Sequence, residues 1–192
     1  FLTAETVIQI ALPDLHVTWL CVTLLSVLYF TYCSEMWNQL DALTGLLNQN
    51  SYLNRTAEMS RSGGLLIVFD VDNFKQVNDC YGHLQGDACL AAIAACLKKA
   101  YACCGYCYRI GGDEFCVLLK STAKEAACAE EFLRQLEKKR RELTFLPTVS
   151  CGSAPLSGED VVAVKDQADR AMYHHKKARK ERAAAKQPQM TI

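Results

Sequence analysis

The sequence predicts an α+β domain, in which an antiparallel sheet has helices packed on one face and an apolar helix precedes the domain. Three observations support this. Residues 65–70 form a short apolar, β-branched run that ends in Asp70, as a buried strand would. Residues 106–108 and 115–119 are apolar runs on either side of a Gly-Gly turn, which is typical of a hairpin. Helical patterns separate these strands, and the resulting order favours an antiparallel sheet.

The remaining elements follow from periodicity along the chain. We expect helices near residues 45–59 and from about residue 73, and another over residues 86–99, where apolar residues recur at helical spacing. Residues 123–143 predict a charged helix with an apolar stripe, and residues 148–154 a strand. A final helix is expected over residues 160–182, followed by a flexible tail over residues 183–192.

The N-terminal part is treated as a separate segment, residues 1–34, joined by a short helical linker over residues 35–40. Residues 15–33 contain no Lys, Arg, Asp or Glu and are apolar on every helical face. Their length approaches the roughly 20 residues that cross a bilayer. We therefore expect a transmembrane helix in an inner (cytoplasmic) membrane, with a buried or dimer-forming helix as the alternative.

Composition excludes some classes of protein. The formal net charge is zero, so nucleic acid is not expected as a partner. The eleven cysteines are scattered along predicted strands and helices, which indicates a reducing compartment rather than a disulfide framework. A C-x-x-C pattern ends at Cys107, but no second pair accompanies it, which argues against a zinc site.

Two acidic positions mark a candidate ligand site. Gly111 and Gly112 form the predicted hairpin turn, and Asp113 and Glu114 follow directly. Adjacent carboxylates repel each other unless a cation or a proton separates them, and glycines allow a bulky ligand close to the backbone. Asp70 ends the predicted strand, where such folds often place ligand sites. Together these carboxylates would suit Mg²⁺, although a plain turn would show the same glycines.

These residues resemble the GGDEF family of diguanylate cyclase domains, whose members condense two GTP molecules into cyclic di-GMP. Five motifs carry the resemblance in the family's order, and together they lie within residues 41–182. They are residues 41–48 (DALTGLLN), 69–79 (FDVDNFKQVND), 81–87 (YGHLQGD), 109–115 (RIGGDEF) and 168–173 (ADRAMY). The resemblance implies a ferredoxin-like nucleotidyl-cyclase fold, related to the palm of nucleotide polymerases.

The resemblance also implies roles for single residues. Asp70, Asp113, Glu114 and the carbonyl of Val71 would hold Mg²⁺, or Mn²⁺ in its place. Asp70, Asp113 and Glu114 would be catalytic, and for Glu114 a metal-ligand role and a base role both stay open. The substrate would lie against bare backbone at the two glycines of the turn.

Guanine would be read by two further positions, Asn78 and Asp87. A carboxylate accepts hydrogen bonds from both the ring N–H and the exocyclic amine of guanine, a pair that adenine lacks. The sequence therefore favours GTP over ATP. The alternative for Asp87 is that it satisfies free amides at the start of a helix.

Phosphate contacts are expected at both ends of the domain. Lys75 follows the acidic turn, where the backbone of Phe74 would also cradle phosphates. Lys176 falls on the family's phosphate-binding lysine. Lys180 falls where the family usually has arginine, and lysine lacks the bidentate fork. A solvated basic helix end is the alternative for both lysines.

One domain would bind one GTP, so catalysis would need a homodimer with two facing half-sites. Residues 102–105 (ACCG) stand where product-inhibited members carry Arg-x-x-Asp, and we expect no feedback site there. If GTP is the substrate, the catalytic domain faces the cytoplasm. A GGDEF-like module that binds GTP without converting it, and a purely structural dimer, are the competing functions.

Overall fold

The computed structural model describes residues 2–11, 17–37, 39–158 and 160–185, and it divides into two units, residues 1–39 and 40–192. The first unit contains α1 (Leu2–Ala11) and α2 (Val17–Trp37). No helix in the described ranges is long and apolar enough to cross a membrane, so the expected transmembrane helix is not supported.

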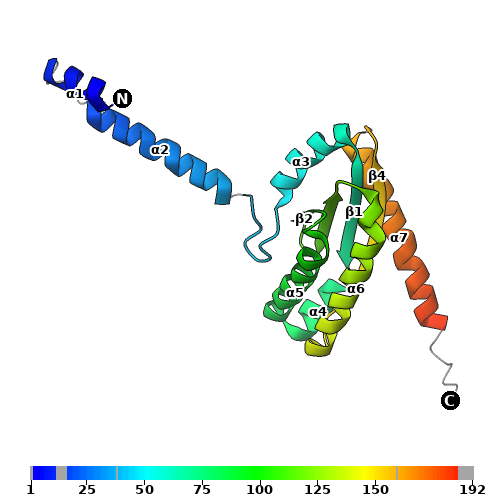
Figure 1. Ribbon diagram of the computed structural model, residues 1–192. Coiled ribbons are helices and arrows are strands. Elements are labelled where there is room, and N and C mark those ends of the chain that lie inside the picture. Colours follow the sequence, from blue (N-terminus) through cyan, green and yellow to red (C-terminus); the bar gives the residue numbers. More distant parts are fainter. Residues whose placement is uncertain (1, 12–16, 38, 159, 186–192) are drawn as a thin grey trace. The chain divides into compact units, whose positions relative to one another are not determined.

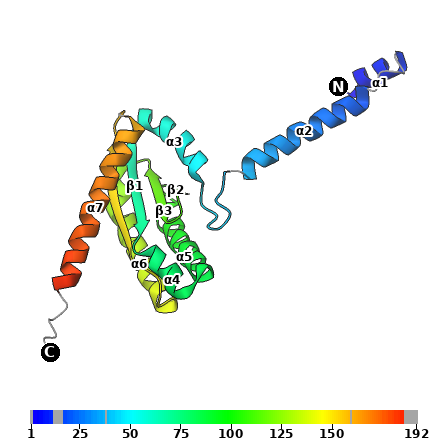
Figure 2. The ribbon, with the colours of Figure 1, turned by 180° about the vertical axis from the view of Figure 1, so that it is seen from behind.

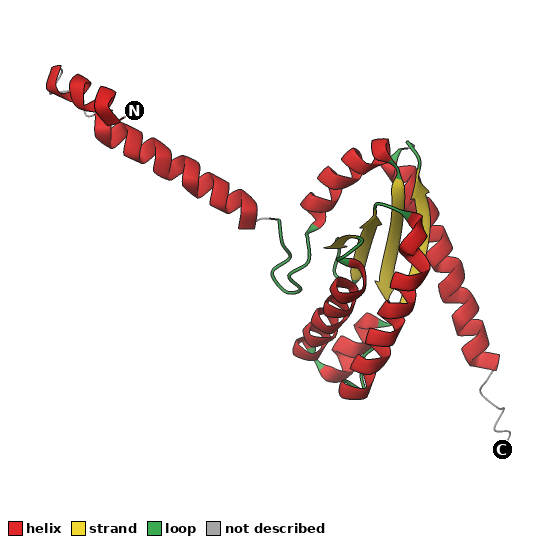
Figure 3. Cartoon of the chain, viewed as in Figure 1, coloured by secondary structure: helices red, strands yellow, loops and turns green. Residues whose placement is uncertain are grey.

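The second unit is built on a four-stranded antiparallel sheet, drawn in yellow in Figure 3. Its strands are β1 (Gly64–Val71), β2 (Gly105–Arg109), β3 (Glu114–Leu119) and β4 (Val149–Leu156), in the order β2-β3-β1-β4. Between and around them run α3 (Gln49–Ser62), α4 (Phe74–Tyr81), α5 (His83–Tyr101), η1 (Thr122–Lys124), α6 (Glu125–Glu142) and α7 (Val161–Ala185). The predicted antiparallel sheet with packed helices is confirmed.

Helices cover both faces of this sheet, so the expectation of one covered face was wrong (Figures 1 and 2). Alternate β1 residues point to opposite faces. Ile67 and Phe69 join the core beneath α5 and α6, whereas Leu66 and Val68 join a second core with side chains of α3 and α7. The uninterrupted apolar run of β1 is the sequence pattern of a strand buried on both faces.

Helix boundaries depend on local capping. The side chain of Asn48 accepts a hydrogen bond from the amide of Ser51, so α3 begins at Gln49, later than expected from the periodicity. Gly45 lies at φ +64° in the turn before it. At the other end of the domain, a Cβ at Gly152 would lie 2.3 Å from the Ala168 carbonyl oxygen. Only glycine lets α7 approach β4 this closely, and this approach places the later residues of α7 beside β1.

Candidate active site

Asp70 and Glu114 lie opposite each other on β1 and β3, the two neighbouring interior strands of the sheet. They are register partners in the antiparallel pairing of β1 with β3. The amide of Val71 donates a hydrogen bond to the carbonyl oxygen of Asp113 at 3.2 Å, so the end of β1 is joined to the acidic turn. Asp70 and Asp113 therefore lie on adjoining backbone segments.

Asp72 directly follows the last residue of β1 and is a second carboxylate near the site, and it is 6% exposed. It accepts hydrogen bonds from the hydroxyls of Thr148 at 2.7 Å and Ser150 at 2.8 Å, both on or beside β4. Burial of a charged carboxylate is costly unless hydrogen bonds compensate it, as they do here. The sequence analysis assigned no function to Asp72. Its spacing of two from Asp70 was the available signal, since that spacing puts both side chains on one face of a strand.

Lys176 of α7 reaches these carboxylates. Its ammonium group hydrogen-bonds to Asp70 Oδ2 and lies 3.5 Å from Asp72 Oδ1. Partial burial alone would lower the pKa of Lys176, but the hydrogen bond and charge of Asp70, with the charge of Asp72, raise it. The lysine therefore stays charged at neutral pH. The structure thus places Lys176 next to Asp70, one of the predicted metal ligands.

A partly buried ion pair holds the turn that carries the glycines. The guanidinium of Arg109 donates to both oxygens of Asp41, at 3.1 and 3.2 Å, and to the carbonyl of Gly112, at 3.3 and 2.8 Å. Asp41 also accepts hydrogen bonds from the amide and hydroxyl of Thr44, at 2.9 and 2.6 Å. Burial raises the pKa of Asp41, but the hydrogen bonds from Thr44 and Arg109 outweigh it and lower the pKa. In the sequence, these residues stand out only as parts of the motifs at 41–48 and 109–115.

The turn itself is accessible. A Cβ placed at Gly112 would meet no atom within 4 Å, so this glycine is open to solvent or to a ligand. A Cβ at Gly111 would lie 3.2 Å from Glu114 Oε2. Glu114 is exposed and Asp113 is half-buried. This arrangement leaves room for a large ligand along the backbone of the turn.

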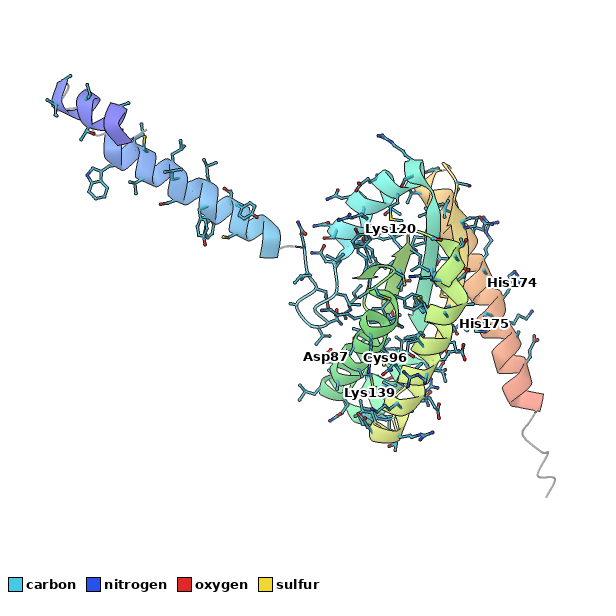
Figure 4. The ribbon with its side chains drawn as sticks, in the orientation of Figure 1. Asp87, Cys96, Lys120, Lys139, His174 and His175 are labelled. Atoms are coloured by element: carbon cyan, nitrogen blue, oxygen red, sulfur yellow. The ribbon has the colours of Figure 1, made fainter. Side chains whose placement is uncertain are left out.

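A second group of predicted residues lies on α4 and α5. The side-chain oxygen of Asn78 is buried and has no hydrogen-bond partner. It sits where a Cβ of Gly86 would be, at a distance of only 1.9 Å, and the ring of Phe74 lies 3.2 Å from the same point. Asp87 is exposed near the start of α5 (Figure 4). An acceptor without a partner, an aromatic ring and an exposed carboxylate suit a flat, polar ligand such as a nucleobase.

Two lysines that were predicted to contact phosphate, Lys75 and Lys180, make no described contact with the acidic residues of the site. Lys75 is exposed at the start of α4, beside Asn73, whose φ of 55° puts it in the left-handed region. The side chain of Lys180 lies outside the part of the chain that is described, although its backbone belongs to α7. The structure thus brings Lys176, but not Lys75, into contact with the carboxylates.

The described residues hold no group of three or more His, Cys, Asp or Glu side chains placed to bind a metal ion. The three carboxylates expected around Mg²⁺ do not form such a group. Mg²⁺ often binds through one or two carboxylates and completes its shell with water and substrate phosphates. The hard oxygen donors of Asp70 and Glu114, together with the backbone carbonyl of Val71, fit that mode of binding. The ammonium of Lys176 pairs with Asp70, one of these oxygen donors.

Comparisons with known proteins identify the family to which the chain belongs. The model of the family described as "Diguanylate cyclase, GGDEF domain" matches residues 38–182. Diguanylate cyclase DgcP of Pseudomonas aeruginosa is 38% identical over 160 residues, which cover 74% of this chain and 23% of that protein. Cyclic di-GMP phosphodiesterase PdeR of Escherichia coli is 36% identical over 149 residues, covering 69% of this chain and 22% of that protein.

Solved structures show the same fold. The GGDEF domain of DgcB from Caulobacter crescentus, solved in complex with c-di-GMP, is 28% identical and superposes with a TM-score of 0.64. The match covers 73% of this chain and 91% of that one. The chain spans less than a quarter of the two curated relatives named above, 23% and 22% of their lengths.

Proposed function

Because the chain belongs to the GGDEF family, we propose that its second unit is a diguanylate cyclase that condenses two GTP molecules into cyclic di-GMP and releases pyrophosphate. One observation carries the proposal: Asp70 and Glu114 are register partners, and the Val71 amide binds the backbone of Asp113. Two sequence-distant acidic segments therefore meet at the end of two interior strands. That is the arrangement which phosphoryl chemistry with a divalent cation requires.

Asp70, Asp113, Glu114 and the carbonyl of Val71 would hold Mg²⁺, or Mn²⁺ in its place. The bound cation would neutralise the triphosphate and stabilise the charge that develops on the α-phosphate. Lys176 would bind phosphate oxygens, with its charge held beside the reacting groups by Asp70 and Asp72.

Guanine recognition would fall to α4 and α5. Asp87 would accept hydrogen bonds from the ring N–H and the exocyclic amine, and Asn78 would contribute its amide group. The backbone of Phe74 would cradle phosphates, and the missing side chain at Gly86 leaves the Asn78 amide its space. Lys75 would contact the terminal phosphates from the start of α4.

One domain supplies one GTP, and the product joins two. We therefore propose that two copies face each other during catalysis, and that the dimer raises the effective concentration of the two half-sites. Because GTP is the substrate, the catalytic unit would work in the cytoplasm. Residues 102–105 offer no Arg or Asp for a product-binding motif, so feedback inhibition through that segment is not expected.

The test is incubation of the whole chain with GTP and Mg²⁺, followed by separation of nucleotides and mass analysis. Cyclic di-GMP should form in the unaltered chain and be lost in Asp113→Ala. Asp166→Asn is the matched control, because Asp166 is an exposed carboxylate on α7 outside the site. Activity should rise faster than linearly with protein concentration across the dimerisation range.

Two outcomes would count against the proposal. Bound GTP that stays unconverted at every protein concentration would identify a sensor module instead of an enzyme. Product formation that survives Asp113→Ala would show that the acidic turn is not the catalytic group.

A further inference from the structure

Three cysteine sulfurs form a line from the surface into the protein where α5 passes into β2. Cys103 Sγ lies 3.1 Å from Cys104 Sγ, and Cys104 Sγ lies 3.6 Å from Cys128 Sγ on α6. Cys103 is exposed, Cys104 is half-buried and Cys128 is buried. An oxidant from solvent would therefore meet Cys103 first and find two further thiols behind it.

Two other described cysteines of the domain, Cys107 and Cys80, differ from this arrangement. Cys107 is buried, its thiol donates to the Leu97 carbonyl at 3.6 Å, and burial raises its pKa to about 12. It therefore remains a protonated, inert thiol. Cys80 on α4 is exposed, but no sulfur contact involves it in the described part of the chain. Cys80 thus offers an accessible thiol without a resolving partner, which makes it a natural control.

We propose that Cys103, Cys104 and Cys128 form a thiol relay that a peroxide converts into a Cys104–Cys128 disulfide. The Cys103 sulfur attacks hydrogen peroxide, the O–O bond breaks, and a sulfenic acid and one water result. The Cys104 sulfur then displaces the sulfenic hydroxyl, which leaves as a second water after taking the thiol proton. Finally Cys128 attacks the Cys104 sulfur and its proton passes to Cys103, which leaves as a thiol. In sum, one peroxide is reduced to two waters, and two thiols are oxidised by two electrons.

Geometry determines where the relay ends. The α-carbons of neighbouring residues are about 3.8 Å apart, below the usual separation of about 4.4–6.8 Å across a disulfide. The intermediate Cys103–Cys104 bond is therefore strained and easily attacked. Cys104 lies in the turn before β2 and Cys128 lies on α6, 24 residues further along the chain, so their bond is free of that restriction. Transfer to Cys128 relieves the strain and moves the disulfide into the protein interior.

The closed loop would contain β2, the Gly111–Gly112 turn and β3. Cross-linking a loop of that length removes freedom mainly from the unfolded chain. We expect the melting temperature to rise by on the order of 10 °C after oxidation. The neighbouring Cys104 sulfur raises the pKa of the Cys103 thiol. Oxidation should therefore be slow at neutral pH, and treatment should last minutes to hours.

The experiment treats the whole chain, previously reduced, with hydrogen peroxide, alkylates the remaining thiols and maps non-reduced peptides by mass spectrometry. A peptide pair joined through Cys104 and Cys128 is the expected product, together with the rise in melting temperature. Cys103→Ser should slow its formation at least tenfold, and Cys128→Ser should stop the reaction at a Cys103–Cys104 bond without stabilisation. Cys80→Ser should match the unaltered chain.

Three results would overturn the relay. Sulfinic acid at Cys103 without any cross-link would show that the Cys104 thiol does not react with the sulfenic acid at Cys103. An unchanged rate in Cys103→Ser would show that Cys104 or Cys128 reacts directly with peroxide. A dominant cross-link to Cys107 would show that the disulfide is not passed to Cys128. Because these readouts are peptide masses and melting temperatures, the relay can fail while the cyclase proposal stands, and the reverse.

Discussion

Replacing Arg109 by methionine tests how the domain holds its glycine turn. The side chains of Arg109 and Asp41 are only 14% and 24% exposed, and the guanidinium makes four hydrogen bonds, to Asp41 and to the Gly112 carbonyl. Hydrogen bonds to charged groups each contribute about 1.5–3 kcal/mol, and the loss of one partner leaves the other charge without compensation. Because both side chains keep some contact with water, we expect Arg109→Met to lower the free energy of unfolding by about 2–3 kcal/mol.

The assay is reversible urea unfolding, supported by thermal melts, in which that loss corresponds to roughly 5–10 °C for a domain of this size. Arg109→Lys keeps the charge but loses the fork, so its loss should be intermediate. Asp41→Asn completes a double-mutant cycle, in which the coupling energy should be about 1–2 kcal/mol. Cyclase activity should fall further than stability explains, because the turn loses its position.

Arg134→Met is the matched control. Arg134 pairs with Glu131 at 2.8 Å on α6, but its side chain is 69% exposed. Exposed pairs of this kind contribute at most about 1 kcal/mol. If Arg109→Met were no more destabilising than Arg134→Met, the Asp41 contact would not stabilise the turn and the reasoning would fail.

Three further predictions concern the ligand site and its pH dependence. Gly86→Ala should weaken GTP binding at least tenfold in calorimetry, because the added Cβ would lie 1.9 Å from the Asn78 side-chain oxygen. Gly112→Ala is the control: its Cβ would meet no atom within 4 Å, so this variant should fold normally. An equal loss of folding in both variants would contradict this reasoning. Lys176→Gln should weaken GTP binding about tenfold, since a charge-assisted contact to phosphate is lost. An unchanged affinity for GTP would show that Lys176 does not bind the phosphates. In the folded state the pKa of Asp41 is lowered from its ordinary value of 3.8, so the ionised carboxylate stabilises the fold at pH values above 3.8. This stabilisation should be lost as the pH falls through the folded-state pKa. The stability gap between the unaltered chain and Asp41→Asn should therefore narrow in melts below about pH 4, and a constant gap would refute the assignment.

The sequence predicted those parts of the fold that depend on local pattern. The apolar run ending at Asp70 and the Gly111–Gly112 turn identified β1 and the hairpin, because strands and turns have short-range signatures. The prediction that helices cover only one face of the sheet was wrong, although the uninterrupted apolar run of β1 already indicated a strand buried on both faces. Alternation within a strand is visible only when one face is polar, and both faces of β1 are apolar.

The site was predictable as a list of residues but not as a set of contacts. Arg109 and Asp41 are 68 residues apart, and Thr148 and Asp72 are 76 apart, so no local pattern links either pair. The same holds for Lys176, which reaches Asp70 only because Gly152 lets α7 approach β4. Contacts of this kind depend on the packing of the whole domain.

The position of β1 and β3 inside the sheet has a consequence for how the site can move. Asp70 and Glu114 lie on these two strands, and β2 and β4 flank them on either side. Amide hydrogens in such strands exchange with solvent only when a large cooperative part of the domain opens. The acidic centre therefore cannot melt by itself. In the proposed dimer, regulation would therefore act on the encounter of the two half-sites rather than on local unfolding of the strands that carry Asp70 and Glu114.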